Sequence, residues 1–441
     1  MKKIVLSIAA VMAASAFAPE ASAVPAFARQ TGMACSACHF QSFPALTGFG
    51  KAFKTAGYTM MGAQEKIEGE HGLSIPATLN MAVYMQARYQ KTNGPRGVVA
   101  GVPTPGTFNS NNGRIDLPDE FSLFIGGRVS ENIGTLTELS MTAGSSQATT
   151  AAGPMAGVTA EGGTGVAGFK LPVMFDVGSV KLGVVPFTVG GLGPQYGFDL
   201  FATGSTANGR VIENGVGYSA NMYLGGNSDA SGAAIVVANE TFHVSVTPWA
   251  QGFNVTNAGL SATKLSGTYL RAAYTPSVAD WDLGVGIQNY SGDSLAGIDT
   301  VVSANKDEMT IIDFQGQGEV AAMPVGIYGS YGWASAPGLG QTNSYNAGPN
   351  RRSYFGLLGD LGVIPNTLNV QFGFARAKTG AVLGNESDNS YTLGLRYKLA
   401  QNVKAGLAYT KFSGAASNVG GSRNAAGEGD SLLNLIFSVG Y

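Results

Sequence analysis

The 441-residue chain has few charged residues for its size. Lysine, arginine, aspartate and glutamate make up 12% of it, about half the ~25% typical of soluble globular proteins. The 26 basic and 28 acidic residues leave a formal net charge of −2, so no basic excess indicates nucleic-acid binding. After the first 18 residues, no apolar run approaches the ~20 residues of a membrane-spanning helix. The composition therefore argues against a nucleic-acid-binding protein, a helical membrane protein and an ordinary enzyme with a charged surface.

Cysteine and histidine are also scarce, with two and three residues respectively. Both cysteines lie in Cys35-Ser36-Ala37-Cys38-His39, which has the C-x-x-C-H spacing of covalent c-type haem attachment. Two thiols on one helical turn can reach the two vinyl groups of one porphyrin, and the adjacent histidine then ligates the iron. A thioredoxin-like dithiol lacks its βαβ context, a closed zinc site lacks four ligands, and a simple disulfide is the third alternative. We predict one haem c on Cys35 and Cys38, with His39 as proximal ligand.

The sequence leaves the sixth ligand of the iron open. Met60, Met61 and His71 follow the cysteines closely enough for a short segment to fold back. Methionine would raise the reduction potential and a second histidine would lower it, and an open position is a further alternative. We prefer Met60 or Met61 to His71. We expect an aromatic shell around the haem from Phe27, Phe40, Phe43, Phe49, Phe53 and Tyr58.

The amino terminus has the pattern of an export signal. Two lysines precede a mostly apolar run over residues 4–17, and Ala21-Ser22-Ala23 then gives a small-x-small cleavage site. We predict a secretory signal peptide over residues 1–23 and a mature chain from Val24, with cleavage after Ala18 as the alternative. Segment 24–72 is small for a free-standing domain, so haem or docking into a larger structure must stabilise it.

From Leu73 onward, apolar residues alternate with small or polar ones. Segments 368–374, 391–399 and 403–410 show this period of two, which predicts strands with one apolar face. A soluble sandwich would turn that face inward, whereas a transmembrane barrel would turn it to lipid and the polar face to the lumen. The period alone fits both architectures.

Three features favour the barrel. Hairpins repeat over about 370 residues, which is more than one sandwich uses. Short turns, such as 131–132 and 178–179, alternate with long Gly-, Ser-, Asn- and Thr-rich connections, as in outer-membrane barrels. The chain also ends on an alternating strand with a terminal aromatic, Tyr441, which resembles the assembly signal of such proteins. We therefore predict an all-β, antiparallel transmembrane barrel over residues 73–441, placed by the barrel-assembly machinery in the lipid of a Gram-negative outer membrane. We expect segment 24–72 to dock in or under its lumen.

The number of strands depends on the region 190–250. Bacterial barrels have an even number of strands, and 231–250 as one strand gives 16. A turn at 238–240, with a further strand in 190–213, gives 18. The single strand would turn Glu240 to lipid, which is costly and favours the turn. In both cases His243 falls on the lumen-facing row, where we expect a polar lining residue.

The amino-terminal motifs resemble those of a known family. Pro25–Gly32, Cys35–His39, Phe49-Gly50-Lys51 and Gly57-Tyr58-Thr59 resemble the fused cytochrome–porins, outer-membrane monohaem cytochromes implicated in iron(II) oxidation. The resemblance is dense over about 35 residues, with Lys51 standing where arginine is expected. The barrel resembles the family in size and pattern alone. The resemblance implies haem on Cys35 and Cys38, His39 as ligand, and 16 strands, which we prefer despite Glu240.

The expected function follows from the motif and the barrel together. An external donor, Fe(II) by the resemblance, would pass one electron to the haem, which would reduce a periplasmic soluble cytochrome. The protein would then act as an oxidoreductase. Two alternatives remain from the sequence: a solute channel with a structural or regulatory haem, and electron export to an external acceptor. The chain shows no Gly-rich nucleotide loop in a βα context and no nucleophile–base constellation.

Overall fold

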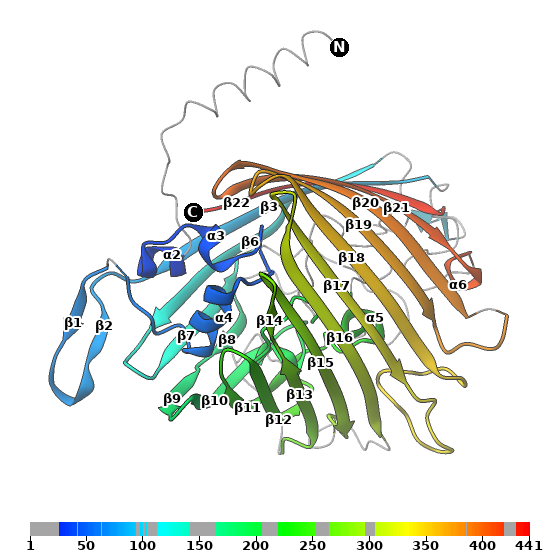
Figure 1. Ribbon diagram of the computed structural model, residues 1–441. Helices are drawn as coiled ribbons and strands as arrows, with labels where there is room; N and C mark the ends of the chain where they lie inside the picture. Colours follow the sequence, from blue (N-terminus) through cyan, green and yellow to red (C-terminus); the bar gives the residue numbers. More distant parts are fainter. Residues whose placement is uncertain are drawn as a thin grey trace, which may run out of the picture.

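The computed structural model shows short helices, a small hairpin and a large barrel (Figure 1). It describes residues 26–41, 43–62, 64–93, 98–99, 102–103, 113–141, 165–204, 219–252, 264–295, 305–384, 386–418 and 429–441. The expected signal peptide, residues 1–23, lies outside the described residues. The elements before the barrel are α2 (Ala26–Thr31), α3 (Cys35–Cys38), α4 (Gly48–Thr55), β1 (Lys66–Glu68), η1 (Glu70–Gly72) and β2 (Ser74–Pro76). In the part of the chain that is described, no helix is long and apolar enough to cross a membrane.

The barrel is a closed antiparallel ring of 16 strands. Two strands are interrupted: β8 (Gly165–Lys170) with β9 (Val173–Val177), and β13 (Gly267–Tyr274) with β14 (Ser277–Val278). The remaining strands are β3 (Met81–Thr92), β6 (Arg114–Arg128), β7 (Gly134–Ser140), β10 (Val180–Val189), β11 (Ala230–Ala238), β12 (Phe242–Ala250), β15 (Trp281–Gly292), β16 (Asp307–Val320), β17 (Met323–Ala334), β18 (Arg352–Ile364), β19 (Leu368–Lys378), β20 (Ser387–Ala400), β21 (Val403–Ser413) and β22 (Ser431–Gly440). Pairing of β22 with β3 closes the ring, which confirms the predicted all-β barrel and its 16 strands.

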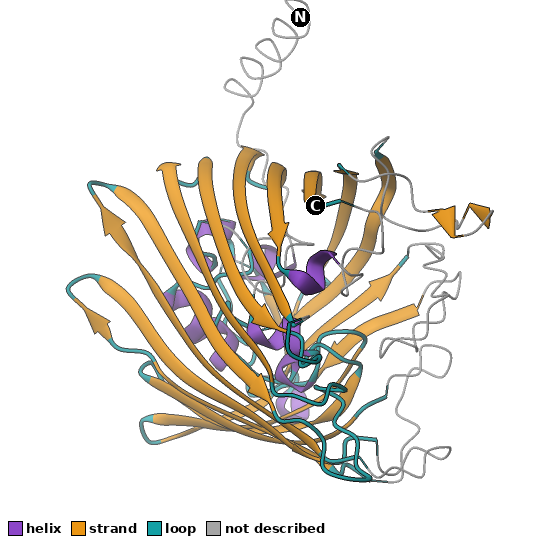
Figure 2. Cartoon of the chain, turned by 90° about the vertical axis from the view of Figure 1, so that its right-hand side faces the viewer, coloured by secondary structure: helices purple, strands orange, loops and turns teal. Residues whose placement is uncertain are grey.

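The predicted link between the turn at 238–240 and a count of 18 was wrong. A turn does separate β11 from β12, where the Asn239 amide donates to the Phe242 carbonyl at 2.9 Å, and Glu240 is exposed there. The total is nevertheless 16 because the described residues of connection 190–229 form no strand. They form η2 (Pro194–Tyr196) and α5 (Ala220–Leu224), which lie inside the ring of strands (Figure 2).

The two faces of each strand meet different surroundings. In β16, Ile312 and Phe314 point outward and are 46% and 40% exposed, whereas Asp313 points into the lumen and is fully buried. The alternation follows from the period-two geometry of a strand. Inward rows hold apolar side chains as well as polar ones, since connection 190–229 packs against them: Leu224, Trp249 and Met309 belong to one buried cluster inside the barrel. The inward rows are therefore more apolar than the small or polar face that the alternation predicts.

The two ends of the barrel differ in their connections. Short turns join β9 to β10, β16 to β17 and β20 to β21 at one end of the barrel. The carboxyl terminus lies at the same end, because the backbone of Tyr441 pairs with that of Val83 near the start of β3. The opposite end carries the longer connections, with three further short elements: β4 (Val98–Val99), β5 (Val102–Pro103) and α6 (Ala415–Asn418). Outer-membrane barrels have short periplasmic turns and long extracellular loops, so we refer to the two ends as the turn end and the loop end.

Candidate functional site

The C-x-x-C-H segment folds as one helical turn held against a second helix. Cys35 and Cys38 begin and end α3, and both are free thiols that are partly buried. Thr47 caps α4 by accepting from the Gly50 amide at 3.1 Å, and its hydroxyl donates to the Ala37 carbonyl at 2.6 Å. Gly50 has no room for a side chain, because a Cβ there would lie 2.1 Å from the Cys38 carbonyl oxygen. The two cysteines are thus presented on one rigid turn.

His39 follows α3 directly, and its imidazole is oriented by the backbone. Its Nδ1 lies 3.3 Å from the Ala45 carbonyl oxygen, so Nδ1–H donates there and Nε2 keeps its lone pair. Burial, together with the nearby charges of Lys404 and Lys54, lowers the pKa of His39 to about 4. A neutral imidazole with one nitrogen held by a backbone carbonyl is the usual form of a histidine metal ligand.

The three candidate sixth ligands lie in two different places. The Met60 carbonyl accepts from the Gln30 side chain at 2.8 Å, so the segment carrying Met60 and Met61 packs beside α2. His71 lies in η1 at the tip of the β1–β2 hairpin, where it is exposed. That hairpin projects away from the barrel (Figure 1). The structure therefore brings the methionine segment into the helical head and leaves His71 outside it.

The predicted aromatic residues divide into separate groups. Phe27 stacks on Tyr58 with ring centroids 4.8 Å apart, and Phe53 packs edge-on against Phe27 at 5.2 Å. Phe43 instead packs against His39, with centroids 5.6 Å apart. Phe40 packs on a cluster that joins the head and the interior connection to the barrel wall, and Phe49 is partly buried. The expected single shell is thus divided between a small core for the head, a neighbour of His39 and a contact with the wall.

We call residues 26–62 the head, and the head lies in the turn-end mouth of the barrel. Its contacts reach several sides of the ring: Gln41 with Asp360 and Asn369, Lys51 with Asp282, and Thr59 with Arg128. On a further side, Gly134 lies so close to Gly57 that a Cβ would approach the Gly57 carbonyl oxygen to 1.8 Å. Docking in or under the lumen was predicted for segment 24–72, and it holds for the head. The last part of that segment, β1 and η1, instead belongs to the hairpin that projects away from the barrel.

Basic side chains gather on the wall beside Cys35. Lys398 and Lys404 are directly opposite each other on β20 and β21, and both interact electrostatically with Cys35 and with Arg396. Arg396 donates to Asp360 at 2.8 Å. The wall beside Cys35 therefore carries a local excess of positive charge.

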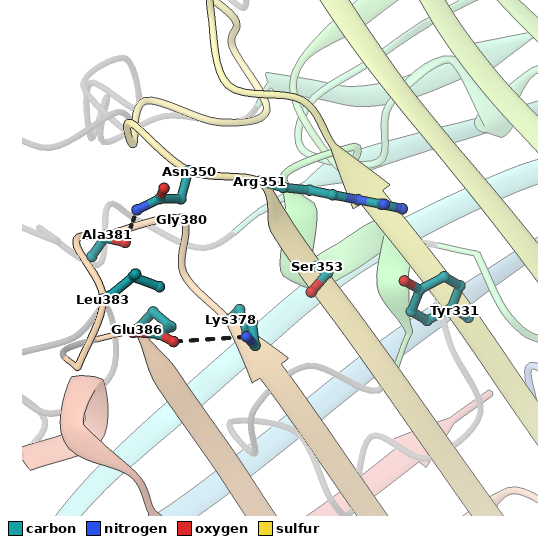
Figure 3. Close-up of a pocket in the computed structure, with 9 residues that line it drawn as sticks. All are labelled: Tyr331, Asn350, Arg351, Ser353, Lys378, Gly380, Ala381, Leu383 and Glu386. Carbon is teal, nitrogen blue, oxygen red and sulfur yellow. Dashed lines mark hydrogen bonds and ion pairs between the residues drawn. The ribbon is translucent and has the colours of Figure 1, made fainter.

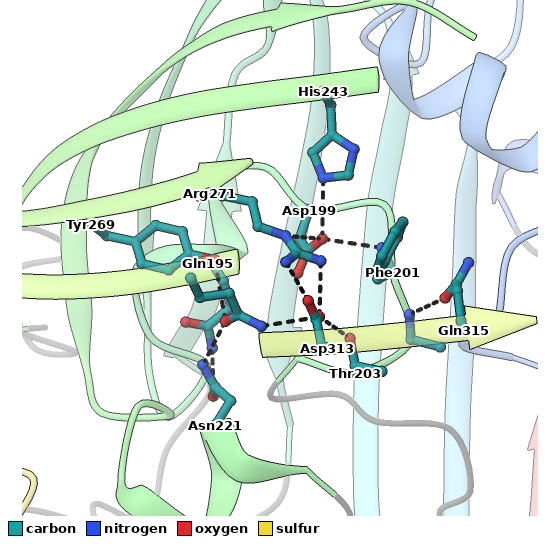
Figure 4. A network of polar contacts seen from close by, with 12 residues as sticks. Gln195, Asp199, Phe201, Thr203, Asn221, His243, Tyr269, Arg271, Asp313 and Gln315 are labelled. Carbon is teal, nitrogen blue, oxygen red and sulfur yellow. Dashed lines mark hydrogen bonds and ion pairs between the residues drawn. The ribbon is translucent and has the colours of Figure 1, made fainter. Parts of the chain in front are cut away.

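A buried charge cluster lies deeper in the lumen, where connection 190–229 meets the wall (Figure 4). Arg271 of β13 binds Asp313 of β16 with two parallel bonds of 2.7 and 2.9 Å. Its Nε donates to Asp199 of the connection at 3.2 Å, and the His243 ring lies 3.5 Å from the same carboxylate. All four side chains are buried. The cluster fixes the connection to two strands through charge-assisted bonds, which are roughly twice as strong as neutral ones.

The same cluster connects the head to the interior. The Lys54 ammonium of α4 donates to the Asp199 carbonyl at 2.5 Å. On the other side, Gln288 donates to Asp313 at 3.2 Å, and Asn221 of α5 donates to Gln288 at 3.3 Å. Head, interior connection and wall therefore form one continuous polar network through the lumen.

Sequence reasoning named part of this network. His243 lies on the lumen side of β12, fully buried between the rings of Phe198 and Phe201 at 5.8 and 5.7 Å. Arg271 and Asp313 were missed, although a charge at an inward position of an otherwise apolar strand is a readable signal. Asp199 carries no such signal, because its role depends on how the connection folds. Among the described residues, no group of three or more histidine, cysteine, aspartate or glutamate side chains is arranged to hold a metal ion.

Comparison with known proteins finds similarity to outer-membrane barrels. No protein-family model and no curated protein matches the chain. OmpT of Vibrio cholerae is 12% identical, with a TM-score of 0.47 over 86% of this chain and 99% of that one. The outer-membrane channel DcaP of Acinetobacter baumannii is 10% identical, with a TM-score of 0.46 over 85% and 99%. OprB of Pseudomonas putida is 11% identical, with a TM-score of 0.49 over 82% and 93%. Similarity at this level carries no statement about substrate or cofactor.

Proposed function

We propose that this chain is an outer-membrane electron-transfer protein whose head carries one haem c. Cys35 and Cys38 would hold the haem covalently, and His39 would ligate its iron. The observation that carries the proposal is the C-x-x-C-H turn in the barrel mouth, with a neutral His39 held by the Ala45 carbonyl at 3.3 Å. This matches the preparation of a histidine for metal ligation. The resemblance to the fused cytochrome–porins supports the same assignment.

The chemistry of the neighbouring side chains fits a haem. Two free thiols on one helical turn suit the two vinyl groups of a haem. When bound, the haem supplies a one-electron Fe(III)/Fe(II) couple. The chain orients the histidine and, by seating the head among several strands, holds the group at one end of the barrel.

The barrel gives this head its place in the membrane. Outward rows such as Ile312 and Phe314 of β16 are apolar and exposed, which suits contact with outer-membrane lipid. The turn end would face the periplasm, so the head would meet a periplasmic soluble cytochrome. Met33 and Phe43 flank the C-x-x-C-H turn and are 40% and 50% exposed, which offers an apolar contact for such a carrier. The external donor, Fe(II), is proposed from the resemblance.

A solute channel is the second candidate, and the barrel by itself favours it. A closed ring of 16 strands with polar residues on its inner rows is the architecture of a porin, and it requires no electron transfer. In that case the haem would be structural or regulatory. Single-channel conductance in a planar bilayer separates the two, since a barrel occupied by a head and an interior connection passes little current. In electron export, electrons would pass through the same haem from the periplasm to an external acceptor. The reduction potential of the haem distinguishes export from Fe(II) oxidation.

Haem staining of the outer-membrane fraction, with its optical spectrum before and after Fe(II), tests the proposal. We expect a haem-stained band at the size of this chain and a spectrum that shifts to the reduced form. The Cys35→Ser/Cys38→Ser variant should lose the stain, whereas Ser36→Ala, on the same turn, should keep it. A stain that persists in the double variant, or an unstained parent protein, would overturn covalent attachment.

A further inference from the structure

An aromatic belt lies on the outer surface of the barrel towards the loop end. Tyr331 and Trp333 of β17 have ring centroids 5.5 Å apart. On the next strands, Phe374 of β19 packs on Phe355 of β18 at 6.2 Å and on Tyr391 of β20 at 5.3 Å. Tyr331 and Tyr391 are 41% and 51% exposed. Aromatic girdles of this kind mark the membrane–water interface of a barrel.

A pocket of about 340 Å³ opens beside this belt, at the loop end of β18 and β19 (Figure 3). Tyr331 lines one side of it, and Ser353 and Lys378 line it from neighbouring strands. Arg351 and Asn350 come from the connection before β18, where the Asn350 side chain donates to the Ala381 carbonyl at 2.8 Å. The pocket thus joins an aromatic side to a polar rim.

The pocket has an excess of positive charge. Its charged lining residues are Arg351, Lys378 and Glu386. Lys378 lies 3.7 Å from Glu386 but remains 61% exposed. The Arg351 guanidinium lies 4.8 Å from the centre of the Trp333 ring, an arrangement that fixes the planar group by cation–π contact. A guanidinium, an ammonium and the Ser353 hydroxyl around one space are the donors that recognise phosphate.

We propose that this pocket binds the phosphate of a phosphorylated glycolipid of the outer leaflet, with its acyl chains lying along the aromatic belt. The position of the pocket favours a lipid over free phosphate, because Arg351 and Lys378 lie on the outside of the barrel next to the aromatic belt. Tyr331 and the belt below it offer acyl chains an apolar surface that a free phosphate would not use. The inference rests on the proposed outer-membrane orientation of the barrel and is independent of the haem.

Titration of the purified full-length protein with glycolipid, followed by native mass spectrometry, tests the proposal. The probes are a diphosphorylated glucosamine glycolipid and the same lipid without phosphates. We expect the phosphorylated form to bind at least about tenfold more tightly. The variant Arg351→Gln/Lys378→Gln should lose about tenfold or more of that affinity. Lys66→Gln/Lys264→Gln removes two exposed cations elsewhere and should bind like the parent protein.

Several results would overturn the inference. One is that the parent protein binds the two lipids with equal affinity. A second is that the pocket variant binds the phosphorylated lipid as tightly as the parent protein. A third is that the control variant loses as much affinity as the pocket variant. Inorganic phosphate is the remaining arm: if it alone displaces the lipid at millimolar concentration, the site recognises free phosphate and the lipid assignment is wrong. Heat-dependent gel mobility verifies that each variant retains its barrel. The haem stain is measured on the same samples, so that failure of the haem proposal is seen separately.

Discussion

Arg271 is the residue on which the interior of the barrel depends most. Its guanidinium lies between Asp313 and Asp199, and none of the three side chains is more than 7% exposed. Arg271→Met would leave two buried carboxylates without their cation, and removal of one partner of a buried ion pair costs about 3–5 kcal/mol. We therefore expect a loss of that size in the free energy of unfolding, measured by urea unfolding of the protein in lipid vesicles.

Lys181→Met is the matched control for Arg271→Met. It breaks the ion pair of Lys181 with Asp176, which is 2.7 Å long but has an Asp176 side chain that is 73% exposed. Pairs of this kind contribute at most about 1 kcal/mol. If both variants lost the same small amount, the buried cluster would not hold the interior connection as described.

The sixth ligand of the proposed haem can be assigned by substitutions in the head and in the neighbouring hairpin. Loss of a methionine ligand lowers the reduction potential of a haem. We expect Met60→Leu or Met61→Leu to lower the potential measured by redox titration and His71→Gln to leave it unchanged. Met33→Leu, an exposed methionine of the same head, serves as the control. A potential that responds to His71→Gln and to neither methionine would contradict our preference.

The residues found from the sequence differ in kind from those it missed. Cys35, Cys38 and His39 were proposed as haem residues because that chemistry depends on local spacing, which folding does not change. Asp199, Arg271 and Asp313 act through contacts between a connection and two distant strands. No local pattern specifies such partners. The division of the aromatic residues among three surroundings was missed for the same reason.

At the scale of elements, the close approach of Gly57 and Gly134 determines how the head meets β7. A Cβ on Gly134 would lie 1.8 Å from the Gly57 carbonyl oxygen, so Gly134→Ala must displace the head or the strand. We expect a protease to cleave the head of this variant faster than that of the parent protein. Gel electrophoresis of the protease-treated outer-membrane fraction measures the rate. Gly359→Ala makes the same change in β18, where the nearest atom is 4.0 Å away, and should leave the rate unchanged. Unaltered protection in Gly134→Ala would mean that the head does not depend on this contact.

The outward face of the strands predicts a dependence on depth. Ile312, near the middle of β16, and Val320, at its turn end, are both exposed, at 46% and 54%. Arginine at the bilayer midplane of a barrel costs about 2–4 kcal/mol, but about 0–1 kcal/mol near the interface. Ile312→Arg should therefore destabilise the folded protein in vesicles, and Val320→Arg should have little effect. Equal effects would contradict the placement of this face in lipid.

Most of the strands were predictable from the sequence, but the sequence did not explain why the barrel has 16 of them. Alternating hydrophobicity identified the strands, since the period is local. The count of 16 was preferred on a family resemblance. The count of 18 was wrong because the described residues of connection 190–229 lie inside the barrel and form no strand. The β1–β2 hairpin was also unpredicted, because it is two short strands of three residues each.

At the scale of the whole molecule, the closed ring of strands, the interior connection and the head form one connected structure. The network from Lys54 through Asp199 to Arg271 and Asp313 joins all three parts. Composition agrees with this arrangement: charges are few because one face of each strand is apolar and exposed. The chemistry of the proposed function lies at one end of this structure, so it requires the barrel to position the haem in an insulating membrane.

The central claim is that the head carries electrons between the two sides of the membrane. The most direct measurement uses vesicles that contain the haem-loaded protein in their membrane and an oxidised soluble cytochrome inside. Fe(II) is added outside, and the spectrum of the enclosed cytochrome is followed. We predict its reduction with the parent protein, one electron per Fe(II), and none with Cys35→Ser/Cys38→Ser. An enclosed cytochrome that stays oxidised in intact vesicles, while the same protein passes a large steady ion current in a bilayer, would contradict the account and favour the solute channel.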